Sequence, residues 1–344
     1  MFWHPLFLGI IAVDVVALFL VLATGITALR TTLDWQPLSA GSRQLSLEAK
    51  AEAAVCQGRA AFWLYLFSAF LLIFGIANVF HEDIPGAMCG TGVCQAMAPG
   101  CARLLIYTGL LLLLMQVWYE LEQLNRERVE MPLAASNARL FLVIPPVAFL
   151  ALIQTADTFA RIDTHRPVDC CAVVYDQFAT LQEARTVVGL EDPLWIGTFI
   201  VLSILLLGLG VAINQGATAG GRTRTALAVV SLLWLPVAGL TLVNVLSAYH
   251  YGVLHHHCPW CLFLPEHNLV GYPLYGAMGW IGMEGFTVLC LPRAVKKKPS
   301  VYKQSLDRCR RAGRRIVFAE ILFLALALIP ALLWRLRYGV WISG

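Results

Sequence analysis

The sequence predicts an all-α fold, a polytopic bundle of about eight transmembrane helices. Of its 344 residues, 59% are hydrophobic and 13% are charged, and the mean hydropathy of +0.71 is too high for an ordinary soluble domain. Apolar runs of roughly the 20 residues that cross a bilayer recur along the chain. They cover 6–29, 60–80, 103–122, 140–160, 194–213, 226–248, 272–291 and 316–334.

The first run is interpreted as a membrane helix and not as a removable signal peptide. No basic segment precedes it, Asp14 lies inside its apolar stretch, and no small-residue cleavage site follows. We therefore count it among the spans.

The distribution of lysine and arginine predicts the direction of each helix. The segment 293–315, between the last two runs, is the most basic, and the positive-inside rule places it in the cytoplasm. Three further loops with basic residues then share that side: 30–59, 123–139 and 214–225. Both termini are expected outside, although Arg335 and Arg337 there depart from the rule. The remaining external loops are 81–102, 161–193 and 249–271.

The cysteines segregate by side of the membrane. Seven of the ten fall in the external loops, where disulfides form and persist, whereas Cys56, Cys290 and Cys309 lie near the reducing inner face. An odd number cannot all pair, so at least one thiol is expected to stay free or to bind a metal or a partner. The seven are Cys89, Cys94, Cys101, Cys170, Cys171, Cys258 and Cys261.

The segment Cys258-Pro-Trp-Cys261 predicts a redox-active dithiol. Two intervening residues allow one turn to bring both sulfurs within bonding reach. A helix N-terminus there, helped by protonated His257, would lower the pKa of the first thiol. We expect Cys258 to be the exposed nucleophile and Cys261 its buried partner. A purely structural disulfide is less favoured, because so short a loop constrains the unfolded chain little.

The same loop also contains the ligands of a metal site. A mixed nitrogen and sulfur set of the kind that Zn or Cu binds lies within one short stretch. Neighbouring histidines cannot all face one ion without contorting the backbone, which favours the dithiol. The set comprises His255, His256, His257, Cys258, Cys261 and His267.

The other external cysteines suggest a relay. Adjacent cysteines such as Cys170 and Cys171 form a strained ring if they bond to each other, so each is expected to have a different partner. Cys89 and Cys94, joined by a glycine-containing link, suit a shuttle pair, and Cys101 could then bridge to Cys170 or Cys171. The alternative is a rigid outer cap in which disulfides staple the three loops together.

The order of these parts resembles the core of the vitamin K epoxide reductase family. An in-to-out helix precedes an external loop with paired cysteines and an amphipathic stretch at 173–188, and two more helices lead to C-P-W-C before a fourth. The resemblance covers roughly 139–292. It divides the chain into an N-terminal three-helix segment, 1–138, this four-helix core, and a basic loop with a last helix, 293–344.

Bacterial members of that family pass electrons from substrate thiols to a membrane quinone. The resemblance implies that Cys258 and Cys261 are the quinone-proximal pair and that Cys170 and Cys171 are shuttle cysteines. Family members space their loop cysteines apart, whereas here the two are adjacent.

Three further side chains are candidates for the quinone site. Trp260 could cover a quinone ring, His257 adjoins the dithiol, and Glu284 is the proton-handling candidate among the intramembrane acids. The alternative for Trp260 is a place in the interfacial aromatic belt. The other acids in apolar runs are Asp14, Asp157 and Glu320.

We therefore expect a membrane thiol-disulfide oxidoreductase that exchanges electrons between external protein thiols and quinone. The alternatives are a non-catalytic subunit of a respiratory or transport complex, or a Cu- or Zn-binding membrane protein. Expected partners are lipid and either an external thiol protein or other subunits, but no nucleic acid. A bacterial inner membrane with periplasmic cysteine loops fits this interpretation. No ATP, NAD or zinc-protease motif occurs, and no mid-membrane histidine suits haem.

Overall fold

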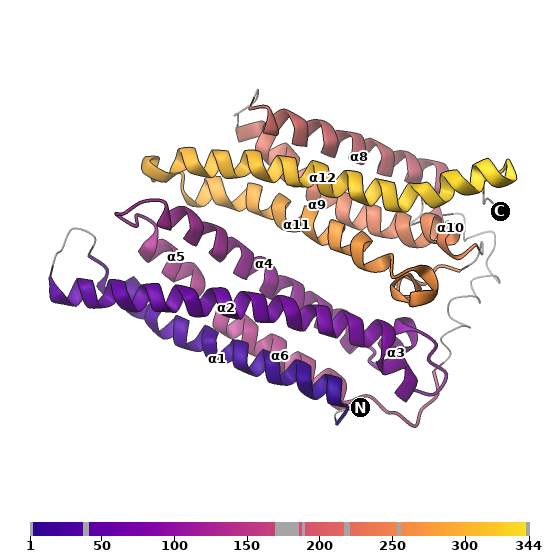
Figure 1. Ribbon diagram of the computed structural model, residues 1–344, viewed down its shortest axis with the longest axis horizontal. Coiled ribbons are helices and arrows are strands. Elements are labelled where there is room, and N and C mark those ends of the chain that lie inside the picture. Colours follow the sequence, from indigo (N-terminus) through magenta and orange to yellow (C-terminus); the bar gives the residue numbers. More distant parts are fainter. Residues whose placement is uncertain are drawn as a thin grey trace. The chain divides into compact units, whose positions relative to one another are not determined.

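The computed structural model describes residues 3–36, 41–168, 186–187, 190–216, 221–252 and 256–341. Eight helical segments within these ranges are long and apolar enough to cross a membrane, which confirms the predicted helical membrane fold. Figure 1 shows them as extended helices.

The eight spans lie close to the predicted apolar runs. They are α1 (Pro5–Asp34), α2 (Ser42–Asn78), α4 (Gly100–Arg126), α5 (Ala134–Phe141) with α6 (Ile144–Ala160), α8 (Asp192–Asn214), α9 (Gly221–Thr241) continued by η3 (Leu242–Leu246) and α10 (Ser247–Tyr251), α11 (Gly271–Ala294) and α12 (Pro299–Tyr338). The short elements are η1 (Phe80–Asp83), α3 (Gly90–Ala96), η4 (Cys261–Phe263), η5 (Pro265–His267) and the antiparallel pair β1 (Thr186–Val187) and β2 (Leu190–Glu191).

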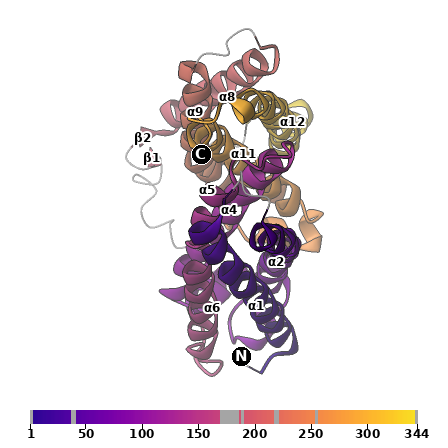
Figure 2. The ribbon, with the colours of Figure 1, turned by 90° about the vertical axis from the view of Figure 1, so that its left-hand side faces the viewer.

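The chain forms two compact units that do not follow chain order. Unit 1 comprises Met1–Gly75, Cys94–Thr164 and Cys290–Leu306, and unit 2 comprises Ile76–Val93, His165–Leu289 and Asp307–Gly344. In unit 1, α6 packs on α1 and α4, and in unit 2, α8 packs on α9 (Figures 1 and 2). The expected division at 138 and 292 differs from this one, because the fourth span belongs with the first three.

The basic segment before the last span is mostly helix. We expected a loop over 293–315, but α11 continues to Ala294 and α12 starts at Pro299. Lysine and arginine are good helix formers, and no proline interrupts the chain between Pro299 and Pro330. α12 therefore has 40 residues and is about 60 Å long, twice the thickness of the hydrocarbon layer.

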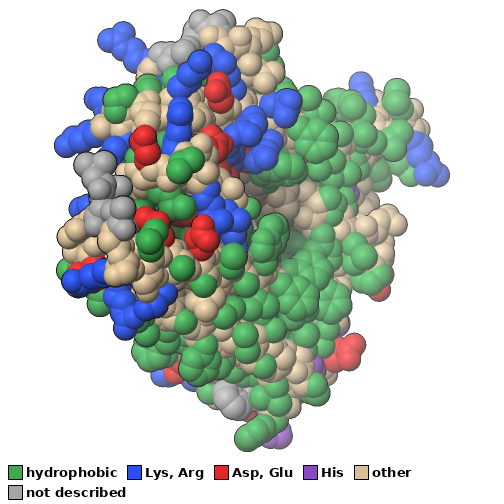
Figure 3. All heavy atoms as spheres, turned by 60° about the vertical axis from the view of Figure 1, so that its left-hand side comes forward, with side chains coloured by type: hydrophobic (Ala, Val, Ile, Leu, Met, Phe, Trp, Pro, Cys, Tyr) green, Lys and Arg blue, Asp and Glu red, His purple; other side chains and the backbone are tan. Residues whose placement is uncertain are grey.

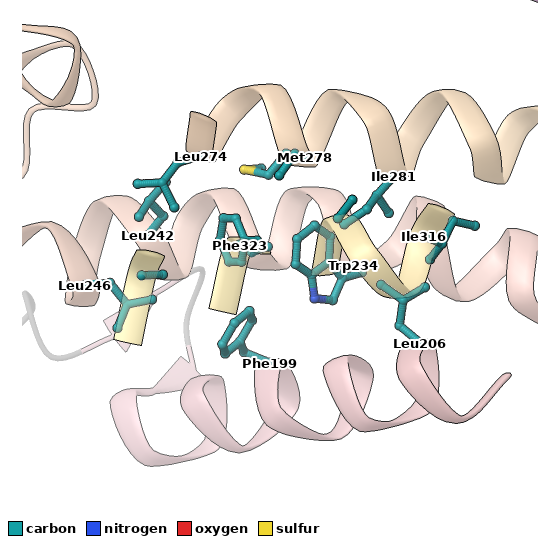
Figure 4. Close-up of a cluster of buried hydrophobic side chains, with 14 of the residues drawn as sticks. Phe199, Leu206, Trp234, Leu242, Leu246, Leu274, Met278, Ile281, Ile316 and Phe323 are labelled. Carbon is teal, nitrogen blue, oxygen red and sulfur yellow. The ribbon is translucent and has the colours of Figure 1, made fainter. Parts of the chain in front are cut away.

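Aromatic side chains form the core of unit 2. The Trp234 indole is fully buried and meets the Phe323 ring edge-on, with 5.0 Å between centroids, and Phe199 lies beside them (Figure 4). The indole Nε1 donates a hydrogen bond to Ser203 Oγ over 2.9 Å, so its polar atom is satisfied inside the apolar core. These contacts join α8, α9 and α12.

Two glycines let α8 and α12 approach closely. A methyl group on Gly313 would lie 2.8 Å from the carbonyl oxygen of Gly210, and one on Gly210 would lie 2.7 Å from the Val317 side chain. Small residues at a helix crossing allow backbones to pack tightly, which is a main source of helix association in lipid. The crossing fixes these two helices of unit 2.

Large apolar side chains cover much of the surface. Phe19, Leu33, Ile204 and Phe318 are each more than half exposed. Figure 3 shows hydrophobic side chains gathered over wide areas of the face that it presents. A surface of this kind is stable against lipid tails and would aggregate in water, which agrees with the membrane assignment.

Candidate thiol site

Three buried cysteines of unit 2 form one cluster. The Sγ atoms of Cys89, Cys258 and Cys261 all lie within 4.8 Å of one another. The exposed fractions are 3% for Cys89, 1% for Cys258 and 8% for Cys261. We call these three residues the thiol cluster. Cys258 and Cys261 carry no disulfide, and the distance from Cys258 Sγ to Cys89 Sγ, 3.3 Å, is that of a hydrogen bond.

The segment between α2 and α3 brings Cys89 to the cluster. Cys89 precedes α3, and its carbonyl accepts hydrogen bonds from the backbone N–H groups of Gly92 and Val93. Because Gly90 has no side chain, the start of α3 lies directly on the Trp260 ring: a methyl group there would be 2.6 Å from the indole. The indole of C-P-W-C thus holds Cys89 beside Cys258.

The C-P-W-C segment is held as a turn by its neighbours. The Tyr251 hydroxyl donates a hydrogen bond to the Cys258 carbonyl, and the Phe263 N–H donates to the Trp260 carbonyl over 3.0 Å. A single 3-10 turn, η4, begins at Cys261, whereas the long helix α11 begins only at Gly271. The amides near Cys258 are therefore those of a short turn and not those of a long helix.

Hydrogen bonds distinguish the two thiols of C-P-W-C. Those from Cys261, Cys89 and Thr91 hold the pKa of Cys258 well below its usual range, and Thr91 Oγ1 lies 2.9 Å from Cys258 Sγ. The same bond to Cys258, together with Cys89 and burial, raises the pKa of Cys261. The thiolate of the cluster therefore belongs to Cys258. The thiolate is the form of cysteine that attacks disulfides.

Two features of the expected relay are wrong. Cys258 is not exposed but is the most deeply buried of the three thiols, because Tyr251, Trp260 and Leu264 pack against the cluster. Cys94 does not pair with Cys89 as a shuttle: it forms a disulfide with Cys101, seven residues away within unit 1. Cys101 therefore does not bridge to Cys170 or Cys171. These two lie outside the described residues, as does His255.

Of the histidines that we proposed as metal ligands, His257 and His267 do not join the thiol cluster. In the described part of the chain, the one group of three or more candidate ligands is Cys89, Cys258 and Cys261. His257 Nδ1 instead lies 3.2 Å from the Val243 carbonyl, and the His267 ring packs edge-on against Tyr251. Burial lowers the pKa of His267, which favours its neutral form.

Aromatic rings pack beside the thiol cluster, an arrangement that has no signature in the sequence. The Phe263 ring stacks on Tyr275, with 5.1 Å between centroids, and meets Tyr272 edge-on at 4.9 Å. The Tyr272 hydroxyl accepts a hydrogen bond from Asn78 Nδ2 over 2.8 Å, which ties α11 to the end of α2. Trp260 lies beside Phe263 at 5.8 Å.

No protein-family model matches the chain, and neither curated proteins nor solved structures give a match. The functional argument therefore rests on the chemistry of the site itself.

Glu284 lies away from the thiol cluster and is paired with arginines. Its carboxylate accepts hydrogen bonds from Arg308 over 3.2 Å and from Arg315 over 2.9 Å, and Arg308 Nη1 lies 2.8 Å from the other carboxylate oxygen. Glu284 comes 13 residues after Gly271, the first residue of α11, which is about 20 Å along the helix. Through this carboxylate the two arginines fasten α11 to α12.

Proposed function

We propose that the chain is a membrane thiol-disulfide oxidoreductase whose reactive group is Cys258. The observation that carries this proposal is the position of Cys258 Sγ, which lies 3.3 Å from Cys89 Sγ and 2.9 Å from Thr91 Oγ1, with Cys261 in the same cluster. A stabilised thiolate with two sulfur neighbours suits disulfide exchange, because each exchange is an attack of one sulfur on a neighbouring disulfide.

The proposed cycle starts with a disulfide between Cys258 and Cys261. A thiolate of the electron donor attacks it, forms a mixed disulfide and releases one cluster thiolate. The donor's second thiolate then displaces the cluster sulfur, which leaves an oxidised donor and a reduced cluster. Two electrons and two protons pass from the cluster to a quinone, which becomes a quinol, and the Cys258–Cys261 disulfide forms again.

Quinone is the proposed acceptor on two grounds. The order of helices and the C-P-W-C motif resemble a family whose bacterial members reduce quinone. Trp260 also packs against the cluster, and the rings of Phe263 and Tyr275 continue from it. Aromatic rings of this kind can stack on a quinone ring. His257 adjoins Cys258 in the sequence, and its contact with a quinone stays a prediction.

The burial of the cluster calls for an intermediate electron carrier. With exposed fractions of 8% or less, none of the three sulfurs is open to a folded protein substrate. The Val168 N–H donates a hydrogen bond to the Pro85 carbonyl over 2.9 Å, four residues before Cys89. Cys170 follows Val168 by two residues, and two residues span at most about 7 Å. This connection supports Cys170 or Cys171 as the proposed shuttle.

Thiol trapping with and without quinone tests the proposal. The purified protein is reduced, incubated with ubiquinone-1 or buffer, quenched in acid and labelled with a maleimide of known mass. We expect quinone to convert Cys258 and Cys261 into a disulfide in the wild type and to leave both variants, Cys258→Ser and Cys261→Ser, unbridged at this pair. Cys56→Ser is the control, because Cys56 is an exposed thiol of unit 1. A pair that stays reduced with quinone would refute the proposal.

The three-sulfur geometry also favours a second candidate, binding of a soft metal ion such as Cu(I) or Zn(II). Sulfurs bound to one zinc lie about 3.8 Å apart, which falls within the spacing of Cys89, Cys258 and Cys261. Cu(I) accepts such thiolate sets as well. Elemental analysis of the purified protein separates the two candidates. The metal-binding role is supported if the wild type contains one equivalent of metal, if Cys89→Ser loses it, and if quinone does not oxidise the thiols.

A further inference from the structure

Unit 1 contains a small cavity between four of its membrane helices. Each helix contributes an oxygen-bearing side chain to the cavity wall, and the space that the centre of a water molecule can occupy is about 20 Å³. A cavity of this size holds one or two waters or a small ion. The oxygen-bearing residues are Asp14 of α1, Tyr65 and Ser68 of α2, Thr108 of α4 and Thr155 of α6.

Asp14 is the one acid that lines this cavity, and it lies deep in the membrane. It comes nine residues after Pro5, the first residue of α1, or about 14 Å along the helix, near the middle of a hydrocarbon layer about 30 Å thick. Its side chain is 9% exposed and is hydrogen-bonded to Ser68. An ionised group at this depth is costly unless a cation or a proton balances it.

The surrounding groups offer oxygens but no positive charge. The Tyr65 hydroxyl is buried and has no hydrogen-bond partner in the described part of the chain. The Thr155 hydroxyl donates its proton to the Ala151 carbonyl over 2.9 Å, which leaves its oxygen lone pairs available. Tyr65 is the second titratable residue of the wall, and the residues that α4 and α6 contribute are threonine, leucine and alanine.

We propose that this cavity is an intramembrane site for a monovalent cation, in which Na⁺ and a proton compete for Asp14. One carboxylate balances one positive charge, so a bound Na⁺ leaves the buried site neutral, whereas a divalent ion would leave it charged. Carboxylate and hydroxyl oxygens are the hard ligands that Na⁺ takes. The site is separate from the thiol cluster, which belongs to unit 2, and does not depend on the redox proposal.

Carbodiimide labelling tests this site in the full chain. Dicyclohexylcarbodiimide reacts with protonated carboxyl groups in apolar surroundings, and peptide mass spectrometry locates the adduct. We expect the labelling of Asp14 to slow several-fold as NaCl replaces choline chloride at constant pH and ionic strength. Glu320 is the matched control, because it is a fully buried carboxyl in an apolar helix of unit 2 and should show no protection by Na⁺.

Variants and a second readout make the outcome decisive. Tyr65→Phe keeps the ring and removes one oxygen, and it should weaken the protection by Na⁺ several-fold. In parallel, NaCl should raise the melting temperature of the wild type relative to choline chloride, and Asp14→Asn should abolish that rise. A melting temperature and a labelling rate that are both indifferent to Na⁺ would overturn the proposal and leave Asp14 a plain buried acid.

Discussion

Gly90 lies against the indole ring of Trp260 so closely that a methyl group on Gly90 would be 2.6 Å from the ring. This contact joins the loop after α2 to the C-P-W-C turn, which follows it by well over a hundred residues. The same contact keeps Cys89 close to Cys258, and their Sγ atoms are 3.3 Å apart.

The substitution Gly90→Ala should therefore separate Cys89 from Cys258. We expect a destabilisation of about 1–3 kcal/mol from overpacking against the indole. In a Cys261→Ser background, we also expect a several-fold lower yield of the Cys89–Cys258 disulfide after mild oxidation, measured by mass spectrometry. Gly276→Ala, in α11 of the same unit, is the control, because a methyl group there meets nothing within 4 Å. Equal yields in the two variants would contradict the contact.

The lowered pKa of Cys258 predicts a thiolate that persists in mild acid. Hydrogen bonds to the Cys258 sulfur favour its charged form, and the one from Cys261 has the largest effect. The thiolate is therefore present at neutral pH and disappears only when the pH falls below the lowered pKa. Absorbance near 240 nm, followed on lowering the pH, should show this loss in the wild type and not in Cys258→Ser.

Removal of one of these hydrogen bonds should move the titration. Thr91→Val keeps the shape of the side chain but removes the hydroxyl that lies 2.9 Å from Cys258 Sγ. We expect the midpoint of the absorbance change to rise towards the usual range for cysteine. An unchanged midpoint would show that Thr91 does not stabilise the thiolate.

The buried ion pair between α11 and α12 should be costly to break on one side. The Arg308 and Glu284 side chains are 5% and 3% exposed, so Glu284→Gln leaves an uncompensated buried charge and should destabilise the protein by about 3–5 kcal/mol in detergent unfolding experiments. Arg315 is 44% exposed, so Arg315→Ala should cost about 1 kcal/mol or less. The double variant Glu284→Leu with Arg308→Met should recover much of the loss. Equal effects of Arg308→Ala and Arg315→Ala would argue against this ranking.

The glycine crossing in unit 2 gives a further prediction. Gly313→Val places a branched side chain against the Gly210 carbonyl, and the two helices must move apart. We expect a lower melting temperature and a loss of about 2 kcal/mol or more. Gly208→Val, two residues from Gly210 on α8, has open space around it and should be close to neutral.

The fold was predictable because membrane insertion depends on local composition. Each span needs only an apolar run of sufficient length, and all eight runs are readable without knowledge of their neighbours. The helix ends were less predictable. α12, for example, begins at Pro299, well before its apolar run. This start depends on the helix propensity of the charged segment, which hydropathy does not measure.

The site was predictable in its residue types but not in its pairing. From the sequence we expected Cys258, Cys261 and Cys89 to take part in thiol chemistry. Their meeting, however, depends on a packing contact between Gly90 and Trp260, which leaves no local pattern in the sequence. The Cys94–Cys101 disulfide, by contrast, links residues only seven apart. Thr91 and Tyr251 were missed, because a single threonine or tyrosine in a loop or helix gives no signal of its contact with a distant thiol.

The separation of 169 positions between Cys89 and Cys258 in the sequence has a consequence for biosynthesis. Four membrane-crossing segments lie between Cys89, which follows α2, and Cys258: α4, α5 with α6, α8, and α9 with its continuation to Tyr251. Cys89 therefore leaves the ribosome long before Cys258 and must wait, unsheltered by the Trp260 turn, while those spans are inserted. During that interval its thiol is open to oxidants and to small thiols. Timely synthesis of the second half of the chain thus protects the site from being capped before it is complete.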